Sequence, residues 1–180
     1  MIYMPTRSKK SASLKPLRLS LPATSANLGP AFDAAALALN LSLEVEARAA
    51  SSTTIEASGR DPETCGQLQD NLILETYREV LAAQGKEPVP LALRIRNDLP
   101  IGKGCGSSAA ARLAGIALAV HFGRLGWKEH QIVAEASRRE HHPDNAAACW
   151  LGGVAVARMS GGEVQAIKVT PKGKWPLLLA

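Results

Sequence analysis

The sequence predicts an α+β domain in which strands come first and the helix after a glycine-rich loop packs on a mixed sheet. Three strand-like segments precede the first helical pattern, and residues 102–106 carry three glycines directly before an alanine-rich helical segment. Later in the chain, Gly161 and Gly162 separate two further strand-like segments. With 46% hydrophobic and 21% charged residues in 180, the chain can bury one good core.

Residues 1–16 are predicted to form a disordered basic tail ahead of a domain that covers residues 17–180. Five basic residues and no acidic residue occur before residue 19, and they account for the whole net charge of +5. The remaining chain is neutral, whereas a nucleic-acid-binding domain carries a basic face. No apolar run reaches the roughly 18 residues that a membrane helix requires. We therefore expect neither nucleic acid nor a membrane as a partner.

The three cysteines, Cys65, Cys105 and Cys149, are odd in number and share no metal-ligand spacing. Reduced thiols fit this pattern best. We therefore expect a cytoplasmic protein.

The first half of the domain is predicted to consist of strands around one polar loop. Residues 17–21 alternate apolar and polar side chains, as in a half-buried strand. Residues 41–47 alternate strictly, with four apolar side chains on one face, which predicts a strand with one solvated face. Residues 22–33 are rich in turn formers and predict a loop. Residues 53–58 are expected to be the pairing partner of the strand at 41–47.

The second half is predicted to be mainly helical. Asp70 can cap a helix over residues 71–84, and Gly85 ends that helix. The remaining predicted elements are a strand at 89–96, a helix from 107 or 108 to about 124, a helix at 127–139 that Pro143 interrupts, a hairpin of 153–159 and 163–169, and the start of a strand at 175–180.

The segment LPIGKGCGSSAAARLAG, residues 99–115, places glycines against the start of a helix. A helix start carries free N–H groups and about half a positive charge, and glycines let such a backbone approach phosphate oxygens closely. Serine hydroxyls can bind phosphate or Mg²⁺, and Lys103 adds a positive charge. These features favour a polyphosphate site.

Three known patterns compete for this loop. The P-loop pattern fails because Gly104 follows Lys103 where a serine or threonine is needed. Residues 104–109 do match the dinucleotide pattern G-x-G-x-x-A, but that pattern expects a strand running directly into it. A serine-capped surface turn is the third interpretation.

A second cluster, PATSANLGPAFD at residues 22–33, places Thr24, Ser25, Asn27 and Asp33 in one segment. Loops on a rigid scaffold commonly carry function. Ordinary turn chemistry, in which Asn and Asp bond their own backbone, is the alternative explanation.

The third cluster is REHHPDNAAACWLGG at residues 139–153, and it combines Glu140, His142, Asp144 and Asn145 around a proline. It contains no i, i+4 histidine pair, which disfavours zinc. A single carboxylate acting together with phosphates suits Mg²⁺ better. A capped helix junction is the structural alternative.

Together, the three clusters resemble the GHMP family of small-molecule kinases, and within it the homoserine kinases. That family has P-A-T-S-A-N-L-G-x-G-F-D, P-x-x-x-G-L-G-S-S-A-A and E-G-H-P-D-N segments. This chain has PATSANLGPAFD, PIGKGCGSSAA and EHHPDN in the same order, and DNLI at residues 70–73 fits the family's helix that approaches the nucleotide base. The resemblance spans nearly all of residues 17–180.

The resemblance implies a ribosomal protein S5 domain 2-like fold with a left-handed β-α-β crossover, against the general right-handed rule. It also implies a second, C-terminal domain that these 180 residues lack. The side chains that bind the substrate carboxylate in the family lie in that second domain. We therefore expect little activity from this chain alone, and a homodimer is the candidate assembly.

The resemblance also implies a role for each motif residue. ATP is expected over Pro100, Ile101, Gly102, Lys103, Gly104, Cys105, Gly106, Ser107, Ser108, Ala109 and Ala110, with Asn71 helping to hold the nucleoside. Ser108, with Ser107 as second choice, is expected to share Mg²⁺ with Glu140. The residues expected to surround the substrate are Asn27, Asp33, His142 and Asn145, with Asp144 in support; Asp33, His142 and Asn145 are also the catalytic candidates.

The implied reaction transfers the γ-phosphoryl group of ATP to the side-chain hydroxyl of L-homoserine, giving O-phospho-L-homoserine on the way to threonine. This chemistry depends on alignment and charge neutralisation. No residue stands out as a strong base, although Asp33 is the nearest candidate. The alternatives are a nucleotide-binding remnant without catalysis and a different GHMP kinase.

Three positions depart from the family pattern. Ala31 stands where the family has glycine, so the loop must shift if that position needs a positive φ. Cys105 replaces leucine, which is a modest apolar change. His141 replaces the glycine of E-G-H and is expected to bring a bulky side chain close to the proposed Mg²⁺ ligand.

Overall fold

The computed structural model describes residues 14–170, 172–173 and 176–177. Most of the predicted basic tail at 1–16, and most of the predicted strand start at 175–180, lie outside these residues. The described elements are β1 (Leu17–Ala26), β2 (Ala35–Ala49), β3 (Thr54–Gly59), α1 (Pro62–Cys65), α2 (Leu72–Ala83), β4 (Leu91–Asn97), α3 (Ser107–Phe122), α4 (Glu129–Glu140), α5 (Asp144–Leu151), β5 (Val154–Ser160) and β6 (Glu163–Val169).

Strand β2 is the central strand of a six-stranded sheet with the order β3-β4-β2-β5-β6. Both β4 and β5 pair with one edge of β2, and β1 pairs with the opposite edge. Because β2 is 15 residues long, β4 and β5 can share one of its edges, β4 near its end and β5 near its beginning. The β3–β4 pair is parallel and the other pairs are antiparallel, so the predicted mixed sheet is confirmed. Helix α2 lies within the β3–β4 crossover, whose handedness stays a prediction.

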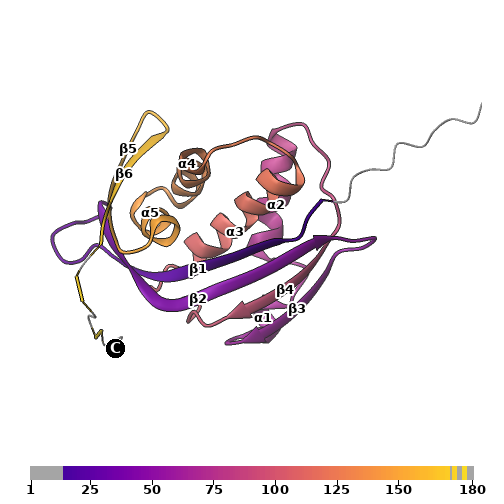
Figure 1. Cartoon of the computed structure of the whole chain (residues 1–180), viewed down its shortest axis with the longest axis horizontal. Coiled ribbons are helices and arrows are strands. Elements are labelled where there is room, and N and C mark those ends of the chain that lie inside the picture. Colours follow the sequence, from indigo (N-terminus) through magenta and orange to yellow (C-terminus); the bar gives the residue numbers. More distant parts are fainter. Residues whose placement is uncertain (1–13, 171, 174–175, 178–180) are drawn as a thin grey trace, which may run out of the picture.

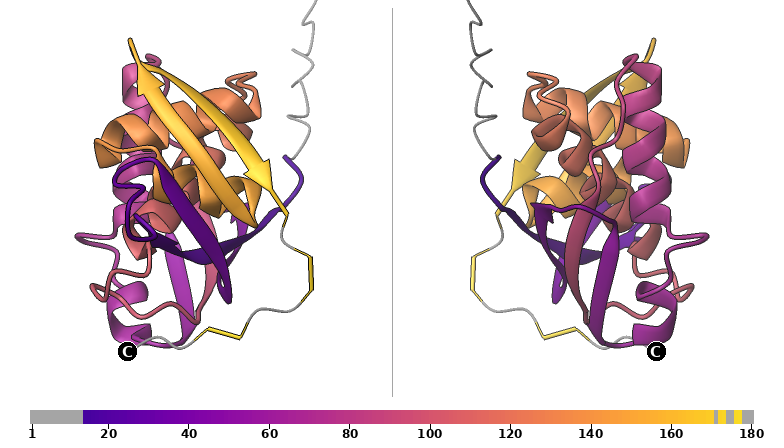
Figure 2. Two further views of the ribbon diagram at one scale, coloured as in Figure 1. Left: turned by 90° about the vertical axis from the view of Figure 1, so that its left-hand side faces the viewer. Right: turned by 90° about the vertical axis from the view of Figure 1, so that its right-hand side faces the viewer.

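The four long helices cover one face of the sheet (Figure 1). The other face is solvated, as the alternation in residues 41–47 predicts. Leu43, Val45 and Ala47 are buried beneath the helices, whereas Glu44 is exposed on the opposite face. The β5–β6 hairpin joins the sheet only through the first residues of β2, and it packs along α4 and α5 (Figure 2). Within the described part of the chain, no helix combines the length and apolarity needed to cross a membrane.

Helix α3 runs through the centre of the core, where small side chains let it approach α2 closely. A β-carbon at Gly115 would lie 2.5 Å from the Ile73 carbonyl oxygen and 2.7 Å from the Thr76 β-carbon. Such short separations exclude any larger residue at this crossing. The alanine-rich sequence after the glycine loop therefore serves helix packing as well as helix formation.

Thr76 lies at this crossing, and replacing it with valine should stabilise the fold. The residue is fully buried, and its hydroxyl has no hydrogen-bond partner among the described residues. Valine keeps the shape and removes the unpaired polar group, so the free energy of unfolding should rise by about 1 kcal/mol. Urea denaturation measures the change. Thr76→Ala also removes a methyl group and should lose the gain, and a Thr76→Val protein less stable than the parent would contradict the argument.

Three predictions about local structure are wrong. Residues 22–26 continue strand β1, because a register shift between Pro22 and Thr24 lets the strand pair with β2 through this segment. Strand β3 pairs with β4, because β4 lies between β3 and β2. Asn71, and not Asp70, caps α2: its Oδ1 accepts the backbone N–H groups of Ile73 and Leu74 at 3.2 and 3.3 Å.

The other predicted elements are confirmed with ends shifted by at most two residues, except that the strand predicted at 41–47 begins six residues earlier, at Ala35. Gly85 follows the last turn of α2 with φ +63°, which is the left-handed conformation that ends helices. The two helices after the glycine loop are separate, and Pro143 divides α4 from α5. The hairpin around Gly161 and Gly162 pairs in the antiparallel sense.

Candidate functional site

The three sequence clusters meet at the start of α3, and Thr24 joins them. Its backbone N–H donates to the Cys105 carbonyl at 3.0 Å, and its hydroxyl donates to Asn145 Oδ1 at 2.6 Å. Gly106 fits between these groups, since a β-carbon there would lie 1.9 Å from Thr24 Oγ1 and 3.2 Å from Asn145 Oδ1. Strand β1, the glycine loop and α5 are therefore in direct contact at this point.

The glycine loop reaches α3 through three left-handed glycines. Gly102, Gly104 and Gly106 have φ values of +71°, +71° and +67°, a conformation that L-amino acids adopt only at a cost. Gly106 is the N-cap residue, and no side chain among the described residues caps the helix. The backbone N–H groups of the first turn therefore remain available to an anion, which the helix dipole also attracts.

A pocket of about 400 Å³ adjoins the loop, between the start of α2 and the start of α3. Its walls are largely apolar, with Ile95, Leu99 and Ile101 among them, and Ser108 lies at its edge. This composition suits a flat heterocycle next to a polar group. Two larger hollows, of about 600 and 650 Å³, lie between α4 and the β5–β6 hairpin and contain none of the predicted site residues.

Asn71 lines the 400 Å³ pocket, but its side chain is occupied by the protein. Besides capping α2 with Oδ1, it donates from Nδ2 to the Cys65 carbonyl at 3.1 Å. It is also buried. The sequence analysis predicts that Asn71 helps to hold the nucleoside. In the structure Asn71 also caps α2, and so it fixes the helix start that lines the pocket.

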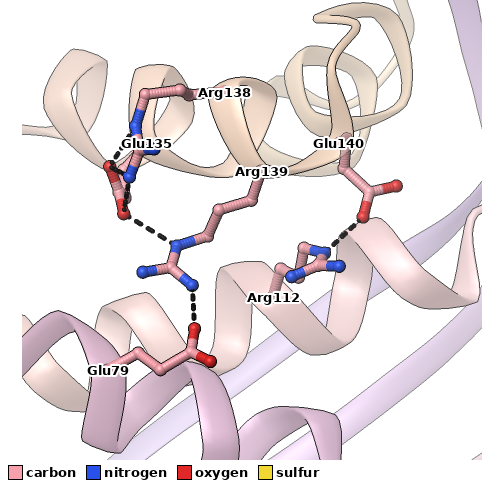
Figure 3. A network of polar contacts seen from close by, with 6 residues as sticks. All are labelled: Glu79, Arg112, Glu135, Arg138, Arg139 and Glu140. Carbon is pink, nitrogen blue, oxygen red and sulfur yellow. Dashed lines mark hydrogen bonds and ion pairs between the residues drawn. The ribbon is translucent and has the colours of Figure 1, made fainter.

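Ser108 and Glu140 come together across the α3–α4 interface. Glu140 Oε1 accepts a hydrogen bond from the Ser108 hydroxyl. The same oxygen pairs with Arg112 Nε at 2.6 Å, and Figure 3 shows this ion pair. The Glu140 side chain is only 10% exposed. Ser108 and Arg112 are four residues apart on one helix, so both face the end of α4.

Arg139 fixes the end of α4 on which Glu140 lies. Its guanidinium pairs with Glu135 Oε1 at 2.7 Å and with Glu79 on α2, so it ties the two helices together (Figure 3). Burial on its own lowers the pKa of Arg139, but the hydrogen bonds to Glu135 and Glu79 outweigh this effect and raise the pKa. The guanidinium therefore stays charged and holds α4 in place at every physiological pH.

The pair of Ser108 and Glu140 fits a magnesium ion by its donor chemistry. A hydroxyl and a carboxylate are hard oxygen ligands, and Mg²⁺ in kinase sites takes few protein ligands and completes its shell with phosphate oxygens and water. Within the described residues, no group of three or more His, Cys, Asp or Glu side chains gathers into a metal site. Oxygens of a bound phosphate would complete the ligand shell of a cation held by this pair.

His142, Asp144 and Asn145 form one hydrogen-bonded group at the start of α5. Asp144 is 1% exposed, and its Oδ1 lies 2.8 Å from His142 Nδ1 and accepts the Asn145 backbone N–H at 2.6 Å. The His142 side chain is 31% exposed. The buried carboxylate thus orients a histidine that is open to solvent.

Asn27 and Asp33 lie in the loop between β1 and β2. Asn27 Oδ1 accepts the Asp33 backbone N–H at 2.9 Å, and both residues have positive φ. The Asp33 carboxylate is exposed and has no hydrogen bond to the other site residues among those described. The structure thus links His142 to Asn145 through Asp144, and Asn145 to the glycine loop through Thr24, whereas no hydrogen bond among the described residues joins Asp33 to this group.

The three departures from the family pattern have different consequences. Ala31 is not among the residues with positive φ, so alanine fits there without backbone strain. Cys105 is buried in the core, where it takes the place of an apolar side chain. His141 is the C-cap of α4 and adopts φ +67°, which is costly for a residue with a β-carbon.

Replacing His141 with glycine should therefore stabilise the protein. Glycine removes the strain of the left-handed conformation, which stabilises the folded state. It also raises the conformational entropy of the unfolded chain, which costs less free energy than the strain, so we expect the free energy of unfolding to rise by about 1 kcal/mol. Thermal and urea denaturation measure this change. His141→Ala keeps the β-carbon and should give no gain, so equal stabilisation by both variants would locate the effect in the histidine ring.

The sequence analysis assigned no role to two residues of the site. Thr24 was named in its segment, but its burial and contacts depend on a strand where a loop was predicted. Arg112 follows Ser108 by four residues in a predicted helix, and this spacing could have indicated that the two share a face.

The chain is similar in sequence to known proteins. Residues 71–153 match the family model described as the GHMP kinases N-terminal domain. The chain is 44% identical to a homoserine kinase of Solibacter usitatus over 162 residues, which is 88% of this chain and 53% of that protein. It is 45% identical to a homoserine kinase of Thermus thermophilus over 78% of this chain and 47% of that protein.

Solved structures give the same picture. A Listeria monocytogenes protein assigned as a homoserine kinase superimposes with a TM-score of 0.74 at 34% identity, covering 87% of this chain and 54% of that one. The homoserine kinase of Cytophaga hutchinsonii shares the fold, with a TM-score of 0.67 at 23% identity over 94% of this chain and 54% of that one. The chain spans about half the length of the curated relatives that it matches.

Proposed function

Because this chain belongs to the GHMP kinases as a homoserine-kinase-like N-terminal region, we propose that it binds ATP and forms the nucleotide half of a homoserine kinase. The reaction is transfer of the γ-phosphoryl group to the side-chain hydroxyl of L-homoserine. The observation that carries the proposal is the convergence of three separate motifs on Thr24 at the start of α3. The names of the 41–45% identical relatives support the choice of substrate.

The nucleotide part of the site is built from the glycine loop and the pocket beside it. The uncapped N–H groups of α3 and the Lys103 ammonium bind the triphosphate over residues 100–110. The base occupies the 400 Å³ pocket, against the helix start that Asn71 fixes. These groups are in place before ATP arrives, so they stabilise developing charge without reorganisation.

Ser108 and Glu140 are the residues that would hold Mg²⁺, with Ser107 as the second choice. The ion, when bound, supplies positive charge that neutralises the phosphate oxygens. Glu140 is kept in position by Arg112, which engages one carboxylate oxygen. Arg139 contributes indirectly, because it fixes α4 against α2.

The acceptor part of the site is the surface around His142 and Asn145, with Asn27 and Asp33 on the adjacent loop. Asp144 orients His142 and does not itself face solvent. Catalysis here rests on holding the substrate hydroxyl in line with the γ-phosphorus, for which alignment and charge neutralisation suffice. The backbone N–H of Asp33 donates to Asn27, so the two residues form one loop surface, and the exposed Asp33 carboxylate is open to a substrate there.

Binding of ATP to this chain tests the nucleotide half directly. Isothermal titration with a non-hydrolysable ATP analogue and Mg²⁺ should show binding, and Ser108→Ala should weaken it about tenfold, because a ligand to both phosphate and Mg²⁺ is lost. Ser51→Ala, in an exposed turn, is the matched control. No binding by the parent, or equal binding by Ser108→Ala, would contradict the proposal.

Homoserine-dependent release of ADP tests the second half. A protein that carries this chain together with the rest of the relatives' length should phosphorylate L-homoserine in preference to other small alcohols. The 180 residues alone are expected to bind nucleotide with little turnover, and robust turnover by them would contradict this expectation. Nucleotide binding without any turnover in the longer protein would favour a non-catalytic nucleotide-binding protein.

A further inference from the structure

The orientation of the Asn145 side-chain amide is set by two buried neighbours. The Thr24 hydroxyl is fully buried and lies 2.6 Å from Oδ1 of Asn145. Asn145 Nδ2 lies 3.4 Å from Asp144 Oδ1 on its other side. An ionised carboxylate only accepts hydrogen bonds, so the nitrogen side of the amide must face Asp144 and the oxygen side must accept from Thr24.

The tautomer of His142 is set in the same way. Asp144 Oδ1 lies 2.8 Å from His142 Nδ1, so this nitrogen carries the proton and donates it to the carboxylate. In the neutral ring, Nε2 then carries a lone pair. No hydrogen bond to Nε2 occurs among the described residues, and the side chain is 31% exposed. His142 thus presents an acceptor outward.

We propose that Thr24 and Asp144 are positioning residues that fix the polarity of the acceptor site, so that it selects a hydroxyl group. Nδ2 of Asn145 has a second N–H besides the one that faces Asp144, and this N–H is the donor, while Nε2 of His142 is the acceptor; both side chains are hydrogen-bonded to the same Asp144 oxygen. A neutral hydroxyl can satisfy both at once, because it accepts from Asn145 and donates to His142. An ammonium group has no lone pair, so it would leave the Asn145 donor unpaired. The inference rests on the proposed function for the identity of the substrate.

The same arrangement of donor and acceptor also orients the substrate hydroxyl towards the phosphoryl group. Its proton faces His142 Nε2 and one lone pair faces Asn145, so the second lone pair remains for the incoming phosphoryl group. Thr24 adds a link to the nucleotide, since its backbone N–H holds Cys105 of the glycine loop at 3.0 Å and its hydroxyl contacts Gly106. One residue therefore sets both the amide orientation and the place of that amide relative to the phosphate loop.

The first test is the protonation pattern of the histidine ring. Long-range ¹H–¹⁵N NMR spectra of the 180-residue chain should show His142 with its proton on Nδ1, and Asp144→Ala should shift it towards the Nε2 form. His141 is adjacent and exposed, so it should stay unchanged and serve as an internal control. A parent His142 protonated on Nε2 would overturn the inference.

The second test separates the effect of the Thr24 hydroxyl from the effect of the shape of the Thr24 side chain. Nuclear Overhauser contacts should place the Asn145 amide protons near the His142 ring in the parent and in Thr24→Ser. In Thr24→Val, which cannot donate a hydrogen bond, contacts of these protons to Gly106 should appear, because the amide can turn over. Backbone amide chemical shifts of residues 102–104 that match those of the parent will show that the glycine loop is intact in the valine variant. Unchanged amide contacts there would overturn the role of Thr24.

The third test measures how strongly the site prefers a hydroxyl group over an amino group. With the ATP analogue and Mg²⁺ present, the longer protein that carries this chain with the rest of the relatives' length should bind L-homoserine at least about tenfold more tightly than L-2,4-diaminobutyrate, the analogue with an amino group in place of the hydroxyl. This ratio should persist in Thr24→Ser and fall towards one in Thr24→Val. A ratio near one in the parent would overturn the selection. If neither compound binds while the histidine and amide signals are as expected, the proposed function fails and the polarity of the site stands.

Discussion

Replacing Gly106 with alanine should abolish tight binding of an ATP analogue and lower the free energy of unfolding by about 3 kcal/mol. Two costs add at this position. The residue has φ +67°, and the new β-carbon would lie 1.9 Å from Thr24 Oγ1. Relief of that overlap requires Thr24 to move, which breaks its contacts with Asn145 and Cys105 together. Urea denaturation and isothermal titration measure the two effects.

Gly104→Ala is the matched control for this experiment. Gly104 has nearly the same backbone conformation, φ +71°, but a β-carbon there would meet nothing within 4 Å. It should therefore cost only about 1 kcal/mol, from backbone strain. Combining Gly106→Ala with Thr24→Ala should restore part of the stability, because the colliding oxygen is gone. Equal losses in the two glycine variants would show that the contact with Thr24 has no energetic role.

Glu140→Gln should remove most of the magnesium dependence of nucleotide binding. The parent is expected to bind the ATP analogue far more tightly with Mg²⁺ than with a chelator, and the variant should reduce this ratio by about 10- to 100-fold. Glutamine keeps an oxygen for Ser108 and Arg112 but lacks the charge that attracts the cation. Titrations in Mg²⁺ and in EDTA give the ratio directly and need no turnover.

Glu135→Gln is the control, since it lies on the same helix and also loses ion pairs, those with Arg138 and Arg139. It is not in contact with Ser108, so the ratio should stay at the parental value. A Glu140→Gln protein with a parental ratio would show that the cation is bound elsewhere. A fall of equal size in both variants would instead assign the effect to displacement of α4.

The sequence predicts those parts of the fold that depend on local patterns. Residues 41–47 show one solvated face because every second side chain is apolar, and β2 has that face. Gly102, Gly104 and Gly106 mark a backbone that needs left-handed conformations, and all three have them. The relative order of the motifs indicates the family. Each of these signals lies within a few consecutive residues.

The parts that the sequence did not predict depend on distant partners. Nothing in residues 53–58 shows that β4 separates them from β2, because pairing is decided by strands that come later in the chain. Asp70 and Asn71 are equally good capping residues, and the positive φ of Asp70 decides between them. The role of Thr24 follows from contacts with Cys105 and Asn145, which only the assembled sheet brings near.

The hydrogen bond between Thr24 and Asn145 joins residues that are 121 positions apart. Closing so long a segment carries a large entropic penalty in a chain that is still open, and the penalty is recovered only when the strands and helices between them have docked. During synthesis, the glycine loop therefore emerges well before the contact that shapes it can form. A nascent chain that ends before α5 lacks the Asn145 side of this contact, so its nucleotide site is incomplete. Nucleotide binding therefore begins only late in folding.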